Sequence, residues 1–124
     1  MKAITIRQPY VQAIILGLKH YETRSWPTNY RGKIFIHAGN NQNDVKKTNL
    51  VSKYNLSNLE FGVILAECEI VDCIQITESF KNKQNKTEMD FGDWDIGRYA
   101  WKLENIKLLN PAIRINGKLG LWNF

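Results

Sequence analysis

The chain has 124 residues, of which 44% are hydrophobic and 23% are charged, and its formal net charge at pH 7 is +5. This length allows one compact core and excludes a second, so we expect a single domain over residues 1–124. No stretch approaches the roughly 18 consecutive apolar residues of a membrane span, and polar residues 7–9 stand where a signal peptide needs its apolar region, so we expect a protein that is neither membrane-bound nor secreted.

The basic residues are concentrated at the two ends of the chain. Residues 1–59 hold nine basic and two acidic side chains, residues 60–95 hold three and nine, and residues 96–124 hold five and one, which gives net charges of +7, −6 and +4. Because the termini of small domains often lie close together, we expect the two basic blocks to share one face. Such a face favours a polyanionic partner, whereas a solvated surface of mixed charge is the alternative.

The first 38 residues alternate between strand and helix patterns. Period-two alternation predicts a short strand over residues 3–7, and apolar residues at helical spacing predict a helix over residues 9–19. Alternation resumes in two further predicted strands, residues 21–26 and 33–38. One face of the earlier of these two carries Glu22, Arg24 and Trp26, and the other face carries Thr23.

The pattern in the middle of the chain predicts one weakly amphipathic helix, one long strand and one polar loop. Asp44 is a plausible N-cap for the helix. Residues 62–76 read as a strand that crosses the middle of the sheet, with Ile64, Ala66, Cys68 and Ile70 on one face. Residues 77–92 are polar and poor in apolar anchors, which predicts a long mobile loop or lid.

The last part of the chain predicts two strands. Residues 98–109 alternate, and their apolar parity changes near Glu104 or Asn105, which indicates a β-bulge. The Asn116-Gly117 dipeptide is typical of a tight hairpin turn before a closing strand. Taken together, the elements predict a mixed α+β fold built as a small barrel that is capped by helices.

The thiols and imidazoles point to no metal centre. Cys68 and Cys73 lie five residues apart in one predicted strand and face opposite ways unless a bulge intervenes, so we expect two structural thiols in a reduced, cytoplasmic protein. Together with His20 and His37 they match no zinc-ligand spacing, and we expect neither a metal nor a cofactor.

Several short motifs carry a resemblance to a known family. They are segments 6–10 (IRQPY), 17–27 (GLKHYETRSWP), 31–32 (RG) with 36–38 (IHA), 97–101 (GRYAW) and 117–122 (GKLGLW). In this order, and across nearly the whole chain, they resemble the ASCH domain family, whose signature runs Gly-x-Lys-x-x-Glu-x-Arg. The resemblance implies a PUA-like β-pseudobarrel of about five to seven strands with two or more capping helices, in a single-domain member of bacterial or phage type.

The resemblance also implies a cleft lined by residues 17–24 and a role in binding RNA or acting on nucleic-acid components. A short bacterial branch of the family removes the acetyl group of 4-acetylcytidine with a lysine, a threonine and a glutamate. Lys19 matches that lysine, whereas Glu22 stands where the branch has its threonine. The acidic partner falls in a segment that offers Glu88, Asp90 and Asp93.

The residues Lys19, Glu22 and Arg24 suggest a reactive cluster without reference to the family. A lysine at the end of a helix, followed by a strand with Glu22 and Arg24 on one face, gathers one carboxylate between two cations. Partial burial would lower the pKa of Lys19 and make it a base or nucleophile, whereas Arg24 would stay charged and suit a phosphate or carbonyl oxygen. The alternative is a structural Glu22–Arg24 pair with Lys19 in solvent.

Further residues are candidates for nucleic-acid contacts. Arg7 and Gln8 sit where a helix N-terminus could receive an anion or could simply be capped. Trp26 is the best candidate for stacking on a base, and His37 could face the cleft as an acid or base or be a satisfied structural histidine. The predicted nucleic-acid-binding set is Arg7, Gln8, Lys19, Arg24, Trp26, Arg31, His37 and Arg98.

Three functions remain open from the sequence. The first is an RNA-binding module, and the second is a small hydrolase that acts on a modified nucleoside, like a 4-acetylcytidine amidohydrolase, or on an RNA phosphodiester. The third is a protein-interaction adaptor with a vestigial cleft. Binding of RNA predicts a long groove and steep salt dependence, whereas catalysis on a nucleoside predicts a closed pocket and weak salt dependence.

Overall fold

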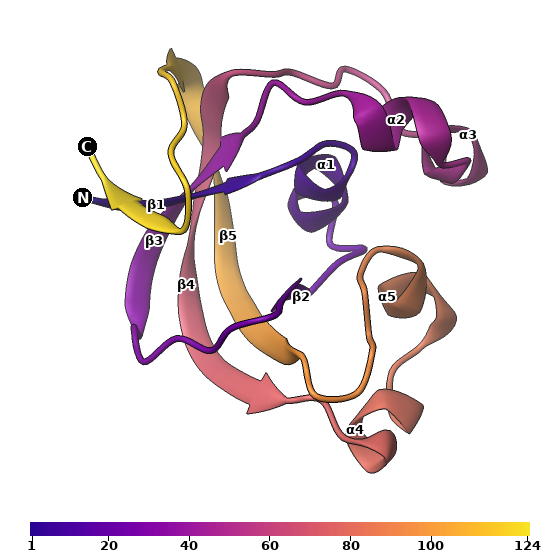
Figure 1. The fold of residues 1–124 in the computed structure, drawn as a ribbon. Helices are drawn as coiled ribbons and strands as arrows, with labels where there is room; N and C mark the ends of the chain where they lie inside the picture. The colour runs from indigo at the N-terminus through magenta and orange to yellow at the C-terminus, as the bar shows by residue number, and fades with distance from the viewer.

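A curled six-stranded sheet packs its concave side against helix α1 (Tyr10–Ile15) in a computed structural model that describes residues 1–124 (Figure 1). The strands are β1 (Lys2–Ile6), β2 (Tyr21–Arg24), β3 (Gly32–Ala38), β4 (Val63–Gln75), β5 (Tyr99–Arg114) and β6 (Leu121–Asn123). The other helices are α2 (Asn43–Lys47), α3 (Leu50–Lys53), α4 (Glu78–Asn82) and α5 (Lys86–Asp90). This confirms the predicted mixed α+β pseudobarrel. No helix is long and apolar enough to cross a membrane.

The strand order in the sheet is β2-β5-β4-β3-β1-β6. β1 and β3 run parallel, which the crossover through α1 allows, and every other neighbouring pair is antiparallel. β6 pairs with β1, and the Met1 ammonium donates to the main-chain oxygen of Phe124 at 3.2 Å. The two ends of the chain therefore lie side by side, as Figure 1 shows.

Alternating apolar residues of the central strands form the main core. Ile34, Ile36 and Ala38 of β3 are fully buried in it, as their shared parity predicted. The prediction for β4 was wrong at Ile64, because the register of β4 shifts between Ile64 and Ala66. That shift moves Ile64 into a separate cluster on the opposite face of the sheet, with Ala3, Phe35 and Trp122.

The bulge predicted in β5 is confirmed. Glu69 pairs with Glu104 and Glu67 with Lys107, so three steps along β5 oppose two steps along β4. Asn105 takes the extra position with φ of 58°, a left-handed conformation that asparagine tolerates better than most residues.

Both cysteines are free thiols in β4. A register shift between Ile70 and Asp72 turns Cys73 toward the same core that buries Cys68. Burial raises the pKa of Cys68 to about 12, so this thiol stays protonated and unreactive at neutral pH.

Several boundaries differ from the sequence prediction: β2 ends at Arg24 rather than at residue 26, and β5 continues to Arg114 rather than ending at residue 109. The first helix ends at Ile15 rather than Lys19, because Gly17 adopts φ of 77° and the main-chain N–H groups of Leu18 and Lys19 both turn back to the carbonyl of Ala13. The prediction of a hairpin turn at Asn116-Gly117 was also wrong, since β6 pairs with β1 and not with β5.

Residues 77–92, expected to form a loop, contain α4 and α5. The side chains of Thr77 and Asn85 cap these helices by accepting from the N–H groups of Phe80 at 3.2 Å and Glu88 at 2.8 Å. Directly after α5, Phe91 is fully buried with Ala13, Leu50 and Leu56. The polar composition of this segment gave no indication of the two helix caps or of the buried aromatic side chain. The segment is therefore largely helical and packed against the core rather than a loop.

Candidate functional site

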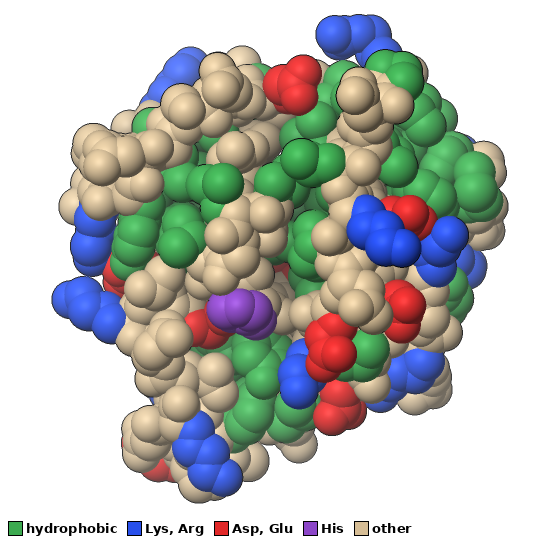
Figure 2. Space-filling model, turned by 180° about the vertical axis from the view of Figure 1, so that it is seen from behind, with side chains coloured by type: hydrophobic (Ala, Val, Ile, Leu, Met, Phe, Trp, Pro, Cys, Tyr) green, Lys and Arg blue, Asp and Glu red, His purple; other side chains and the backbone are tan.

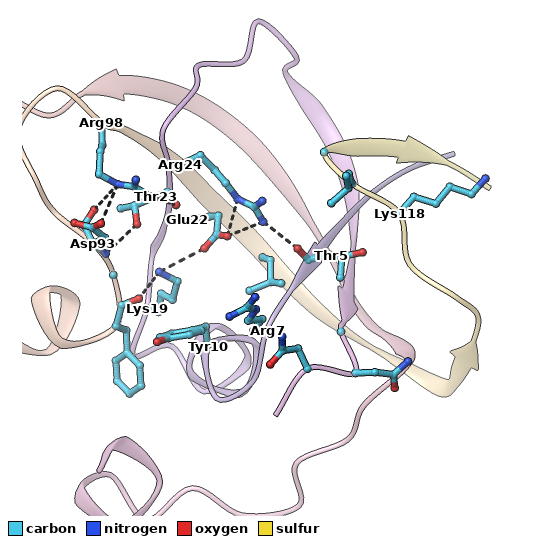
Figure 3. Close-up of a pocket in the computed structure, with 18 of the residues that line it drawn as sticks. Thr5, Arg7, Tyr10, Lys19, Glu22, Thr23, Arg24, Asp93, Arg98 and Lys118 are labelled. Carbon is cyan, nitrogen blue, oxygen red and sulfur yellow. Dashed lines mark hydrogen bonds and ion pairs between the residues drawn. The ribbon is translucent and has the colours of Figure 1, made fainter. Parts of the chain in front are cut away.

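A pocket of about 700 Å³ lies beside the ends of β1 and β2 (Figure 3). Segments 5–7, 39–41, 90–93 and 118–120 complete its wall, together with residues of α1 and β2. The charged side chains that line it are Arg7, Lys19, Glu22, Arg24, Asp90, Asp93, Arg98 and Lys118. Five basic side chains from both ends of the chain therefore meet three acidic ones at a single site.

Lys19 is the most deeply buried of these groups. It follows the Gly17 turn and precedes β2, and only 1% of its side chain is exposed. Its ammonium donates to the main-chain oxygen of Phe91 at 2.6 Å and lies 3.6 Å from Oε1 of Glu22. Burial lowers the pKa of Lys19, and the nearby carboxylates of Glu22 and Glu88 oppose that shift without cancelling it.

Glu22 links Lys19 to Arg24, as the sequence predicted. Arg24 holds Oε2 of Glu22 with Nε at 3.0 Å and Nη2 at 2.9 Å. Nη2 also donates to the main-chain oxygen of Thr5 at 2.9 Å, which fixes the guanidinium between β2 and β1. The cluster therefore holds one buried carboxylate between two cations, and the alternative of a solvated Lys19 is excluded.

Tyr10 completes the buried end of the pocket. The Lys19 ammonium lies 5.9 Å from the centre of its ring, close enough for a cation–π contact. Burial is the main cause that raises the pKa of the Tyr10 hydroxyl, followed by the negative charge of Asp44. The phenol is therefore neutral at physiological pH. Tyr10 is not among the site residues predicted from the sequence, although it belongs to the IRQPY motif.

Thr23 does not point away from this site, contrary to the strand alternation. It lines the pocket beside Glu22, and its hydroxyl accepts from the main-chain N–H of Asp93 at 3.2 Å. β2 is a short edge strand that pairs with β5 alone, and segment 90–93 packs against Thr23, so the consecutive residues Glu22 and Thr23 are both buried.

The three candidates for the acidic partner of Lys19 each contact other groups. The carboxylate of Glu88 is buried outside the pocket and accepts from the main-chain N–H groups of His20 at 2.8 Å and Tyr21 at 3.3 Å. Asp90 accepts from Lys53 and Tyr54, and Asp93 lies 3.6 Å from Arg98. The carboxylate that reaches Lys19 is that of Glu22.

Gln8 was wrongly placed among the binding residues. Its side chain is fully buried, accepts from the N–H of Gln12 at 2.9 Å and donates to the carbonyl of Glu60 at 3.1 Å. The main-chain N–H groups of Tyr10 and Val11 turn back to the carbonyl of Arg7, and Pro9 has none. The start of α1 therefore has no free donor for an anion.

Of the remaining predicted residues, Arg7 and Arg98 line the pocket and Trp26, Arg31 and His37 do not. His37 is buried with both ring nitrogens engaged, by Thr5 at 3.2 Å and by the carbonyl of Ile115 at 2.6 Å. Trp26 packs edge-on against Trp101, with ring centres 4.7 Å apart. These contacts assign a structural role to His37, whereas Trp26 stays 37% exposed outside the pocket.

The distribution of charge elsewhere helps to locate the site. Figure 2, the face opposite to that of Figure 1, shows basic and acidic side chains interspersed among hydrophobic ones and no continuous basic surface. The side chains of four basic residues converge instead at the pocket: Arg7, Lys19, Arg24 and Arg98. No group of three or more His, Cys, Asp or Glu side chains is arranged to hold a metal ion.

The fold and site define a small pseudobarrel domain with a polar pocket beside its first helix. The sequence pattern described as the ASCH domain matches residues 4–115, and the chain belongs to this family. It is 27% identical over 101 residues to activating signal cointegrator 1 of Mus musculus and 26% identical over 101 residues to that of Homo sapiens. Each match covers 71% of this chain and 17% of the relative, so the chain spans a small part of the length of these proteins.

Proposed function

We propose that this ASCH domain binds nucleic acid, RNA in particular, and that one nucleotide unit enters the pocket. The observation that carries the proposal is the Lys19–Glu22–Arg24 cluster, buried against a pocket of about 700 Å³. That volume suits a single small ligand and is too small for a long stretch of strand. The RNA-binding role implied by the family resemblance supports the same conclusion.

The charge of the pocket also supports a nucleic-acid ligand. Five basic and three acidic side chains line it, and this excess of two positive charges favours an anion. The sequence predicted a long groove and steep salt dependence for RNA binding, whereas this site is a pocket for one unit and most of its charges have partners inside the protein. We therefore expect modest salt dependence, equivalent to one or two phosphate contacts. A steep dependence would indicate a more extended binding surface.

A second function, hydrolysis, is favoured by one specific observation, the lowered pKa of Lys19. In this version neutral Lys19 accepts a proton from water as the water oxygen adds to the acetyl carbonyl of a modified nucleoside. Glu22 relays that proton toward the leaving nitrogen, and the C–N bond then breaks to release acetate and the free amine. Arg24 holds Glu22 in place. A ribonuclease would use the same groups on a phosphodiester.

The test is a screen of the purified protein against short single-stranded RNAs and DNAs and against modified nucleosides that include 4-acetylcytidine, with both retention and turnover measured. Lys19→Met removes the amine and keeps a side chain of similar length. It should abolish turnover if the domain is a hydrolase, and it should weaken retention by about fivefold if Lys19 only binds. Lys46→Met, at an exposed position on α2, is the matched control.

Three outcomes separate the functions. Retention of RNA without turnover supports the binding function, and turnover that Lys19→Met abolishes supports the hydrolase. The absence of both with every ligand contradicts both and favours the protein-interaction adaptor. The bacterial or phage origin and the cytoplasmic location remain predictions.

A further inference from the structure

The two sides of the pocket differ in charge (Figure 3). One side is built from segments 5–7, 39–41 and 118–120, which contribute Arg7, Lys118 and two asparagines but no carboxylate. The opposite side is built from segment 90–93, which contributes the carboxylates Asp90 and Asp93. Figure 3 shows Lys118 and Thr5 on one side and Asp93 and Arg98 on the other.

The cations also differ in how far the protein has already neutralised them. The Arg7 side chain is 52% exposed, and its nearest carboxylate, that of Asp44, is 3.7 Å away. Lys118 is exposed and forms no ion pair. Arg24 uses Nε and Nη2 on Glu22 and Thr5, and its Nη1 donates to no group of the chain. Arg24 can therefore offer Nη1 to an anionic ligand without breaking an internal contact, and Arg7 offers a half-exposed guanidinium beside Asp44, whereas the side chain of Lys118 extends away from the pocket (Figure 3).

Arg98 and Lys19, toward the other side, are already engaged. Nε of Arg98 donates to the main-chain oxygen of Asp93 at 3.1 Å, and the carboxylate of Asp93 lies 3.6 Å from the same nitrogen. Lys19 has Phe91 and Glu22 as acceptors. A phosphate placed on this side would face the carboxylates of Asp90 and Asp93 and would be repelled by them.

We infer that the pocket binds a phosphorylated nucleotide in one orientation, with the phosphate on the side of Arg7 and Arg24 and the base on the side of Lys19 and Tyr10. This inference rests on the proposed function and narrows its ligand class, because a nucleoside without a phosphate leaves the donors of Arg7 and Arg24 unused. Arginine guanidinium groups form charge-assisted hydrogen bonds to phosphate oxygens, and here Arg7 presents its exposed guanidinium and Arg24 presents Nη1.

The base side has its own complementary groups. A protonated lysine ammonium has three N–H donors, and the protein provides two acceptors for that of Lys19, which leaves one donor for a carbonyl oxygen of a base. The phenol ring of Tyr10 supplies aromatic surface on this side. This end therefore suits a flat polar ring better than a phosphate.

The experiment compares the affinities of a nucleoside, its 5′-monophosphate, its 3′-monophosphate and a dinucleotide by calorimetry at fixed ionic strength. We expect at least one monophosphate to bind about tenfold more tightly than the nucleoside, as one charge-assisted contact would give. Arg7→Gln should reduce that preference and weaken monophosphate binding more than nucleoside binding. Lys107→Gln, at an exposed position on β5 away from the pocket, should leave the preference intact.

The outcomes distinguish this inference from the proposed function. Equal binding of nucleoside and monophosphates would overturn the inference and leave the proposed function standing. An equal loss of the preference in Lys107→Gln and Arg7→Gln would also overturn it, because the phosphate effect would then be unspecific. Failure of nucleosides, nucleotides and oligonucleotides to bind at all would overturn the proposed function itself. Thermal melting of each variant shows whether the fold is retained.

Discussion

Two lysine–carboxylate pairs of this domain have the same chemistry and opposite properties. Lys19 lies beside Glu22 with the ring of Tyr10 at 5.9 Å, and Lys53 lies beside Asp90 with the ring of Tyr54 at 5.5 Å. Burial lowers the pKa of Lys19. The hydrogen bond that the exposed Lys53 donates to Asp90 is the largest influence on that lysine and raises its pKa.

The difference shows whether the carboxylate partner or the removal from water determines the pKa of each lysine. A carboxylate partner favours the charged form of a lysine, and removal from water disfavours it. At Lys53 the partner dominates, so this pair acts as a surface link between α3 and α5. At Lys19 desolvation dominates, so the fold maintains a lysine that loses its proton more readily than a solvated one. Such a group is typical of a functional site rather than a tether.

The comparison is tested most strongly by neutralising each carboxylate. Glu22→Gln removes the negative charge that lies between Lys19 and Arg24 and leaves two cations buried together. We expect it to lower the free energy of unfolding by about 3 kcal/mol, the usual cost of breaking a buried ion pair. Urea unfolding followed by fluorescence of the tryptophans measures this value.

Asp90→Asn is the matched control, because it neutralises the carboxylate of the exposed pair. The ammonium of Lys53 remains in contact with water after this change. The urea midpoint of unfolding should therefore move much less than in Glu22→Gln. Equal losses in the two variants would mean that the Lys19 cluster is no more desolvated than the surface pair, and the functional assignment of Lys19 would lose its physical basis.

The second test uses pH. The pKa of Lys19 in the folded chain lies below its ordinary value of 10.5, so between these two values the unfolded chain binds a proton that the folded chain has released. Stability contributed by Lys19 therefore rises with pH across this window. The pKa of Lys53 is raised, so its contribution is constant below 10.5 and is lost only as the pH rises through the higher value.

Measurement of wild-type, Lys19→Met and Lys53→Met proteins from about pH 7 to about pH 10 separates the two cases. The difference in unfolding free energy between wild type and Lys19→Met should change in favour of wild type as the pH rises. The difference between wild type and Lys53→Met should stay flat. A flat difference for Lys19→Met as well would contradict the lowered pKa of Lys19.

The sequence predicted the parts of this molecule that depend on local pattern. Alternation identified the buried faces of β1 and β3, and a break in parity located the bulge at Asn105. The spacing of Lys19, Glu22 and Arg24 predicted a cluster that the structure contains, because residues two apart in a strand share a face.

The parts that depend on distant contacts could not be predicted in this way. The main-chain oxygen that holds Lys19 belongs to Phe91, 72 residues away, and no side-chain pattern reports the position of a carbonyl. Gln8 illustrates the opposite error, since its place at a helix N-terminus suggested anion binding, while the carbonyl of Glu60 and the N–H of Gln12 satisfy its side chain in the interior. The prediction for Thr23 was wrong because alternation assumes one solvated face, whereas Glu22 and Thr23 are both buried.

The last and smallest expected effect concerns the two helices within residues 77–92, where the sequence predicts mobility. α4 contains no buried residue, whereas α5 contains Glu88, whose buried carboxylate accepts from the N–H groups of His20 and Tyr21. Phe91, directly after α5, anchors the same part of the segment to the core and to Lys19. Opening α5 would therefore expose the fully buried Phe91 and separate the Glu88 carboxylate from its two N–H donors. Opening α4 breaks local hydrogen bonds and separates only the partly buried Phe80 from Tyr21 and Trp94. Amide hydrogen exchange should be about tenfold faster in residues 80–83 than in residues 88–91, and uniform rates would contradict a division set by Glu88 and Phe91. Glu88→Gln should narrow the difference by raising the rates in α5 alone, because the neutral amide accepts more weakly from the two N–H groups.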